Sequence, residues 1–127
     1  MKSCNPSLIL VDFERTSVDI VRAMTAKSKS IGITLGDQAG IGPEVVSAAL
    51  SSGRLPEGFN YRVIGKKIDV QPGTPTVESA QAALDALEES VELLQAGEIS
   101  AVVTAPVGKE GLHDLGFHFP GQTEFFA

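Results

Sequence analysis

Two glycine-bearing turns carry the residues of this sequence that are best suited to chemistry. The first turn runs from Gly36 to Gly42, directly after the apolar run 31–35, and it holds Asp37. Pro43 follows, and proline suits the first position of a helix because its missing N–H would have no partner there. Free backbone N–H groups at a helix start can hold an anion or a polar substrate. The turn therefore predicts a ligand site, while a tight strand-to-helix connection without a ligand explains the same pattern equally well.

The glycine spacing of this turn excludes two familiar nucleotide motifs. Its pattern G-x-x-x-G-x-G differs from the dinucleotide fingerprint G-x-G-x-x-G, and it lacks the Gly-Lys-Ser/Thr that ends a P-loop. Asp37 is a candidate polar anchor for a ligand. It is explained at least as well as a turn aspartate whose side chain bonds the nearby backbone.

The second turn follows the apolar run 101–104 and leads to Lys109, which is either a contact for an anionic group or a solvated surface charge. His113, Asp114 and His118 lie close by, but their spacing matches no zinc-binding pattern. A G-x-S-x-G elbow does not occur, so a hydrolase triad has no support. The turn thus predicts binding rather than a metal site or a nucleophile of its own.

Alternating apolar strands and helical segments must position both turns. Short apolar runs predict three buried strands, at 31–35, 61–65 and 101–104. The segments between and after them predict helices, at 43–50, after Thr76, at 110–115 and at 122–127. This alternation predicts an α/β fold, with a mainly parallel sheet and helices on both faces. Functional residues should lie at the carboxyl ends of the strands, where both turns are.

The helix that begins after Thr76 is the clearest element of the chain. Thr76, or Thr74 followed by Pro75, supplies an N-cap, and Gly97 stands where the glycine after a helix belongs. Apolar residues at alternating three- and four-residue spacing predict the face that packs on the sheet. That stripe consists of Val77, Ala80, Leu84, Leu87, Val91 and Leu94.

Bulk composition limits the class of protein. A length of 127 residues with 43% hydrophobic residues fits one domain with a core. The net charge of -6 argues against a nucleic-acid partner, because such binding relies on a basic surface. Cys4 is the only cysteine, so no disulfide can form within the chain. No apolar run reaches the roughly 18 residues of a membrane span, and we expect a cytoplasmic protein without membrane contact.

Residues 1–30 differ in character from the rest of the chain. We interpret them as an N-terminal extension, and residues 31–127 as the N-terminal part of an α/β dehydrogenase-like domain. Within the extension, Thr16 or Ser17 is a candidate cap for a short helix. A translation start at Met24 would make most of the extension an upstream addition.

Three motifs, in this order, resemble those of the 4-hydroxythreonine-4-phosphate dehydrogenase family. They are Ile33-Thr-Leu-Gly-Asp-Gln-Ala-Gly-Ile-Gly-Pro-Glu44, Val103-Thr-Ala-Pro-Val-Gly-Lys109 and Gly121-Gln-Thr-Glu-Phe125. The resemblance covers residues 31–127 and is strong at both ends and weak between them. It implies a fold similar to that of isocitrate and isopropylmalate dehydrogenases, of which this chain would hold an incomplete part.

The resemblance also implies a function in pyridoxal 5′-phosphate (vitamin B6) biosynthesis. Enzymes of this family use NAD to oxidise the secondary alcohol of 4-phosphooxy-threonine, and the resulting keto acid loses CO2. They are cytoplasmic homodimers, in which a divalent metal held by histidines of both subunits polarises the alcohol. By this resemblance Gln122 and Thr123 contact the substrate, a small phosphorylated hydroxy-amino acid, with Asp37 and Lys109 as weaker neighbours.

The sequence departs from the family in three respects. Gln122 replaces the histidine of the family's Gly-His-Thr-Glu, and an amide can donate a hydrogen bond but cannot carry charge or shuttle a proton. The family's metal-binding histidines and NAD-binding segments correspond to positions beyond Ala127, and His113 and His118 do not stand in for them. The connection from Gly65 to Gly73 is shorter than the family's, so a strand or two is absent.

These departures predict a truncated chain that is inactive alone. The ligands of the divalent metal are expected outside the chain, and no residue within it is assigned to NAD binding. Phe125 and Phe126 support truncation, because they open a helix that would have little to pack against. Two other interpretations stay open. In the first, the chain is a non-catalytic binding module whose glycine turns hold a phosphate-bearing metabolite. In the second, the chain is a degenerate fragment without a stable fold.

Overall fold

Three short parallel strands form the centre of the computed structural model, which describes residues 29–127. They are β1 (Ser30–Thr34), β2 (Asn60–Ile64) and β3 (Ala101–Thr104), and they lie in the order β2-β1-β3. Ile33 of β1 is in register with Val63 on one side and Val103 on the other. The predicted strand positions and the parallel sheet are confirmed. The predicted extension helix and the start at Met24 lie outside the described residues.

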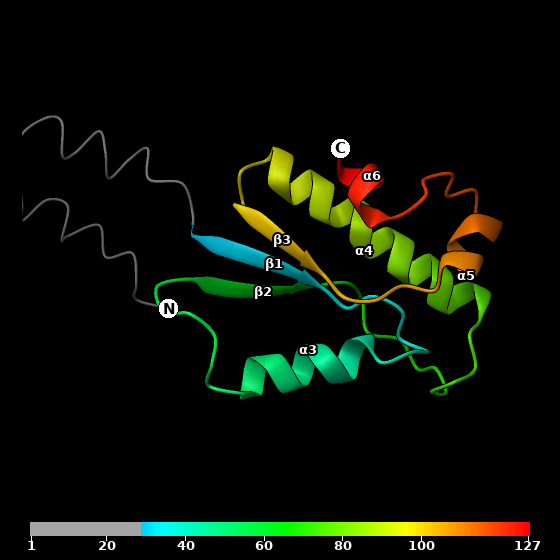
Figure 1. Cartoon of the computed structure of the whole chain (residues 1–127), viewed down its shortest axis with the longest axis horizontal. Helices are drawn as coiled ribbons and strands as arrows, with labels where there is room; N and C mark the ends of the chain where they lie inside the picture. Colours follow the sequence, from blue (N-terminus) through cyan, green and yellow to red (C-terminus); the bar gives the residue numbers. More distant parts are fainter. Residues whose placement is uncertain (1–28) are drawn as a thin grey trace, which may run out of the picture.

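Helices cover both faces of this sheet (Figure 1). One face carries α3 (Gly42–Ser51), and the other carries α4 (Val77–Gln95) with the short α5 (Lys109–Asp114) and α6 (Gln122–Phe126). Side chains alternate along a strand, so Ile33 packs on α3 while Ile64 packs on α4. The predicted α/β fold is confirmed. None of the helices within residues 29–127 combines the length and apolarity that crossing a membrane requires.

A capping box starts α4, the longest helix. Thr76 is the N-cap: its hydroxyl accepts from the Ser79 N–H at 3.1 Å, and the Ser79 hydroxyl accepts from the Thr76 N–H at 3.0 Å. Both donors would otherwise be unpaired at the helix start. Gly97 adopts a φ of 72° just past the other end, a conformation that favours glycine. The structure therefore selects Thr76 over Thr74 as the cap.

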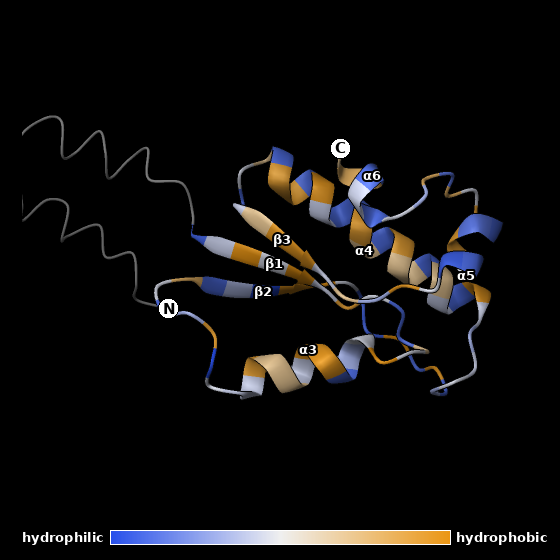
Figure 2. Ribbon diagram, viewed as in Figure 1, coloured by the Kyte–Doolittle hydropathy of each residue, from blue (hydrophilic) through white to orange (hydrophobic). Residues whose placement is uncertain are grey.

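The predicted apolar stripe of α4 matches its buried face only in part, since Leu84 and Leu94 pack at the edge of the core. Val77 is 74% exposed, and of the stripe only Leu87 is fully buried. Polar and apolar residues alternate around the helix (Figure 2). Its buried residues are Ser79, Ala83, Ala86, Leu87, Ser90 and Leu93, and all of these except the two leucines are small. Small side chains let the helix lie close to the sheet, and the buried Ser90 hydroxyl donates to the Leu87 carbonyl oxygen at 2.6 Å.

The prediction that all three strands are buried is also wrong. Val63 of β2 is 41% exposed and Val103 of β3 is 54% exposed, and both face the α3 side of the sheet. In a three-stranded sheet the outer strands have one neighbour each, and α3 is a single helix, about 10 Å wide, on this face. Only β1, the central strand, has a continuous buried segment, from Gly32 to Thr34.

Phe125 and Phe126 pack better than the sequence predicted. Both are half-buried and join a cluster with Leu87 of α4 and Leu112 of α5. The ring centroids of Phe117 and Phe125 lie 5.5 Å apart. The preceding loop folds back over α4 and supplies the partners that local sequence does not reveal.

Candidate functional site

The two glycine turns meet at the carboxyl end of the sheet. The Asp37 N–H donates to the Pro106 carbonyl oxygen at 2.9 Å, which joins the turn after β1 to the turn after β3. Gly36 adopts a φ of 66° at this point, and a Cβ there would collide with the Pro106 oxygen. Only glycine therefore allows the backbones to approach so closely.

A cavity of about 410 Å³ lies beside this junction, between the end of β3, α5 and the start of α6. We name it the Gln122 cavity. Three of the four predicted site residues line it: Lys109, Gln122 and Thr123. The remainder of its wall is mostly apolar, and is formed by Thr104, Pro106, Val107, Leu112, Phe117 and Gly121. The starts of α5 and α6 thus bring the predicted substrate contacts together.

Gln122 is the half-buried polar group of this cavity. Its Nε2 donates to the Ala105 carbonyl oxygen at 3.4 Å, a long and weak hydrogen bond. Its Oε1 is buried and receives no hydrogen bond from any group in residues 29–127. Lys109 and Thr123 are exposed at the mouth. The cavity therefore offers a cation and a hydroxyl at its mouth, which suits an anionic ligand with further polar groups.

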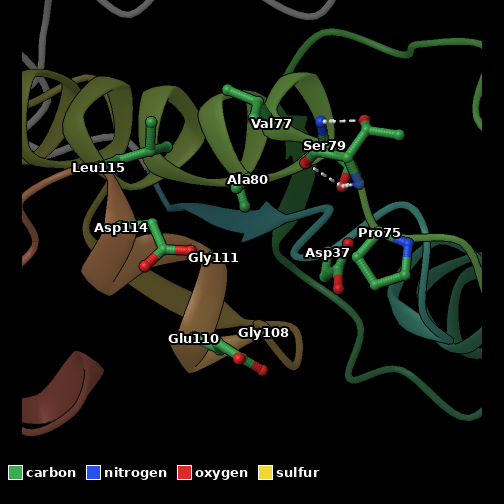
Figure 3. A pocket seen from close by; sticks show the side chains of 12 residues that line it. Asp37, Pro75, Val77, Ser79, Ala80, Gly108, Glu110, Gly111, Asp114 and Leu115 are labelled. Carbon is green, nitrogen blue, oxygen red and sulfur yellow. Dashed lines mark hydrogen bonds between the residues drawn. The ribbon is translucent and has the colours of Figure 1, made fainter.

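Asp37 lines a different cavity, of about 340 Å³, between the first turn, the start of α4 and α5 (Figure 3). Its Oδ1 accepts from the Ala39 N–H at 2.9 Å, as expected for a turn aspartate. The segment after β3 separates the two cavities, because Val107 lines one and Gly108 the other. The structure thus does not bring Asp37 into the Gln122 cavity, and its contact with substrate stays a prediction.

The wall of the Asp37 cavity is acidic. Glu110 and Asp114 of α5 join Asp37 there, opposite the start of α4 (Figure 3). Across residues 29–127, no three His, Cys, Asp or Glu side chains are arranged to hold a metal ion. His113 and His118 are exposed and line neither cavity. The described residues therefore do not fit the divalent metal that the family resemblance implies.

Gln38 has a positioning role that the sequence did not reveal. It is only 7% exposed, and both ends of its amide bond the loop after β2. Its Nε2 donates to the Lys66 carbonyl oxygen at 2.7 Å, and its Oε1 accepts from the Ile68 N–H at 3.0 Å. The first turn thereby holds the irregular connection into α4. Its partners are backbone atoms, so no residue pattern could have identified them.

Comparison with known proteins assigns the family. The family model described as "Pyridoxal phosphate biosynthetic protein PdxA" matches residues 11–127. The chain belongs to the PdxA family. The match begins inside the stretch interpreted as an extension, so the boundary near residue 30 stays a prediction.

Curated relatives and solved structures within the PdxA family agree with the sequence resemblance. A 4-hydroxythreonine-4-phosphate dehydrogenase of Zymomonas mobilis is 34% identical over 78% of this chain. A D-threonate 4-phosphate dehydrogenase of Salmonella typhimurium is 31% identical over 80% of it. The crystal structure of a 4-hydroxythreonine-4-phosphate dehydrogenase from Burkholderia phymatum superposes on 77% of the chain with a TM-score of 0.62 and 28% identity. These likenesses confirm the fold predicted for this chain, because PdxA dehydrogenases have an isocitrate dehydrogenase-like fold.

This PdxA-family chain spans less than half the length of these relatives. It covers 40% of the Zymomonas protein, 44% of the Salmonella protein and 42% of the Burkholderia chain. The Zymomonas match takes up 135 residues of the relative but 78% of this 127-residue chain, about 99 residues. The relative therefore carries roughly 36 more residues within the matched stretch. A shortened connection agrees with this difference, and its place between Gly65 and Gly73 stays a prediction.

Proposed function

We propose that this chain provides the substrate-binding wall of an NAD-dependent dehydrogenase in pyridoxal 5′-phosphate biosynthesis. The substrate is 4-phosphooxy-threonine, whose secondary alcohol is oxidised before the product loses CO2. The observation that carries the proposal is the convergence of Lys109, Gln122 and Thr123 on one cavity. Two of the family motifs supply these residues, and relatives of the chain are named as dehydrogenases of small phosphorylated acids.

Within this proposal each cavity residue has a distinct role. The Lys109 ammonium pairs with the phosphate or the carboxylate of the substrate, because it is a compact cation with three donors. The Thr123 hydroxyl and the Gln122 amide orient the remaining polar groups. Leu112 and Phe117 form an apolar wall that excludes water from one side of the ligand. Asp37, in the neighbouring cavity, is proposed as a more distant substrate contact.

The cofactors and the assembly belong to the complete enzyme in this proposal. NAD would accept the hydride, and a divalent metal would polarise the alcohol. The metal would be held by residues outside 29–127, because the described side chains do not form a metal site. The NAD-binding segments are proposed to lie outside these residues as well, by the family resemblance. The complete enzyme is proposed to be a cytoplasmic homodimer. Residues 31–127 would then be part of its α/β domain, with residues 1–30 as an extension.

The purified 127-residue chain is expected to produce no NADH from 4-phosphooxy-threonine and NAD, with or without a divalent metal. The cavity supplies binding groups, but the acceptor of the hydride has no proposed site in the chain. NADH absorbance is the measurement, and the longer Zymomonas relative under the same conditions is the positive control. Turnover by the short chain would disprove this part of the proposal.

Replacing Lys109 with glutamine is expected to weaken the binding of 4-phosphooxy-threonine by about 10-fold, or ~1.4 kcal/mol. The substitution removes the one cation among residues 29–127 that lines the Gln122 cavity and keeps a polar side chain. Isothermal titration calorimetry of the full chain measures the loss. Lys66→Gln is the matched control, because Lys66 is exposed and lines neither cavity. Equal losses for both variants would mean that Lys109 acts only through net charge.

A second candidate function rests on the same cavity. The described residues that line it lie between positions 104 and 123, and none of them is a His, Cys, Asp or Glu that could bind a metal. A non-catalytic module would bind a phosphate-bearing metabolite there. A chimera that joins the chain to the remaining part of the Zymomonas relative separates the two functions. Production of NADH from 4-phosphooxy-threonine by the chimera favours the dehydrogenase wall, whereas binding without turnover favours the module. A cooperative thermal melt of the chain would exclude the third interpretation, a fragment without a stable fold.

A further inference from the structure

Thr34 is a buried polar residue to which the proposed function gives no role. It is the last residue of β1, its exposed fraction is 0%, and it lines neither the Gln122 cavity nor the Asp37 cavity. Its hydroxyl oxygen accepts a hydrogen bond from the Ala105 N–H at 3.2 Å. Ala105 is also buried and lies one residue past the end of β3. A side chain of the central strand thus holds the start of the turn that follows the neighbouring strand.

The place of Ala105 in the sheet explains why a side chain holds it. The parallel pairing of β1 with β3 ends at Thr34 and Thr104. Beyond this pair, the Leu35 N–H donates to the Ile64 carbonyl oxygen of β2, on the other side of β1, at 3.0 Å. A buried N–H without a partner costs free energy. The Thr34 hydroxyl therefore supplies the acceptor for the Ala105 N–H where the pairing of the two strands has ended.

Threonine suits this position because its side chain is stiff. Branching at Cβ restricts χ1, so the hydroxyl stays directed at the N–H that it accepts from. Side chains alternate along β1, and Ile33 packs on α3, so Thr34 faces the side of the sheet that carries α4, α5 and α6 (Figure 1). The hydrogen bond therefore lies on the same face of the sheet as the helices that border the Gln122 cavity.

The segment 104–109 forms one side of the Gln122 cavity. Several of the residues that line the cavity belong to it: Thr104, Pro106, Val107 and Lys109. Pro106 has no N–H, and its carbonyl oxygen accepts from the Asp37 N–H at 2.9 Å. This bond and the bond from the Ala105 N–H to Thr34 tie the segment to β1 and the turn after it. Of the two, only the bond to Thr34 depends on a side chain.

We propose that Thr34 is a positioning residue for the ligand of the Gln122 cavity. By accepting from the Ala105 N–H, it fixes the direction in which segment 104–109 leaves the sheet, and hence the place of the Lys109 ammonium at the cavity. Thr34 itself does not contact the ligand. The inference rests on the proposed function, in which Lys109 pairs with an anionic group of 4-phosphooxy-threonine. A lysine whose backbone is held in place before binding lowers the ordering cost of binding and so raises the affinity.

Titration calorimetry of the full chain with 4-phosphooxy-threonine tests this role. Thr34→Val keeps the shape of the side chain and removes the acceptor, so it should weaken binding by about 10-fold, the effect typical of one lost hydrogen bond. Thr34→Ser keeps the hydroxyl and should bind within about 3-fold of the unmodified chain. Rescue by serine separates the effect of the hydroxyl from that of side-chain volume. Equal weakening by the two variants, or no weakening by Thr34→Val, would overturn the proposal.

Ser90→Ala is the matched control for a general loss of stability. Ser90 is as fully buried as Thr34, but its hydroxyl donates to the Leu87 carbonyl oxygen within α4, and it lines neither cavity. The substitution should lower the melting temperature and leave the affinity within about 2-fold, as expected for an independent site. If it weakens binding as much as Thr34→Val does, Thr34 acts through stability alone and the positioning role is wrong.

Amide hydrogen exchange measured by NMR reports on the Thr34 bond without any ligand. The Ala105 N–H should exchange slowly in the unmodified chain and about 10-fold faster in Thr34→Val, whereas Ser90→Ala should leave its exchange unchanged. Displacement of segment 104–109 should appear as changed amide shifts from Ala105 to Lys109, which Thr34→Ser restores. An Ala105 N–H that exchanges freely in the unmodified chain would overturn the proposal even if a variant fails to fold.

The two measurements separate this inference from the proposed function. If the unmodified chain does not bind 4-phosphooxy-threonine, the proposed substrate site is wrong, and the amide shifts still decide whether Thr34 places segment 104–109. If Thr34→Val binds as tightly as the unmodified chain, the proposed substrate site stands and the positioning role of Thr34 is overturned.

Discussion

Replacing Gly36 with alanine is expected to lower the free energy of unfolding by about 2–5 kcal/mol. The left-handed backbone at this position costs an alanine ~1–2 kcal/mol. The added Cβ would also collide with the Pro106 carbonyl oxygen, and overpacking of this kind costs ~1–3 kcal/mol. Backbone atoms on both sides of the contact leave no flexible side chain to move away. Urea unfolding followed by circular dichroism measures the loss.

Gly53→Ala is the matched control for this prediction. Gly53 has almost the same φ, 68° against 66° for Gly36, but a Cβ there would meet nothing within 4 Å. It should lose only the ~1–2 kcal/mol of the left-handed backbone. The difference between the two variants then measures the tight junction of the turns. Equal losses would show that the junction relaxes at little cost and is not the rigid contact described above.

Replacing Leu87 with alanine is expected to cost about 2–5 kcal/mol of stability, because the side chain is fully buried and truncation leaves a cavity. Leu87 joins α4 to Leu112 of α5 and Phe117 of the following loop. The substitution should therefore also loosen the wall of the Gln122 cavity. Thermal and urea unfolding measure the loss of stability, and calorimetric titration measures its effect on ligand binding.

Val77→Ala is the matched control on an exposed position of the same helix, α4. Val77 belongs to the apolar stripe that the sequence predicts, but it is 74% exposed. Its truncation should change the stability by no more than ~0.5 kcal/mol. A loss as large as that of Leu87→Ala would show that Val77 is buried like Leu87, as the predicted stripe requires.

The sequence predicts the strands and helices well because their signals are local. Runs of β-branched residues, the cap at Thr76 and the glycine at position 97 each act within a few residues of the element that they delimit. The buried face of α4 is different. A stripe counted from apolar residues alone overlooks Ser79 and Ser90, whose hydroxyls bond their own helix and whose small size lets the sheet approach.

The candidate site could be predicted only in part. Lys109, Gln122 and Thr123 all follow β3, and they meet because the loop after α5 returns the start of α6 to the end of that strand. A parallel sheet gathers the segments that follow its strands at one edge, which places Asp37 there too. This rule does not say on which side of the segment 106–109 the Asp37 side chain lies. That depends on the path of the second turn. Gln38 could not be identified because its partners are backbone atoms of an irregular loop.

The hydrogen bond between the two turns joins main-chain atoms, the Asp37 N–H and the Pro106 carbonyl oxygen. Neither side chain takes part in it. Mutation can therefore alter the charge and shape of both cavities while the scaffold that aligns them persists. Among the residues at this contact, Gly36 is the one whose identity the backbone itself dictates. Side chains that line either cavity can accordingly change without a new fold having to evolve.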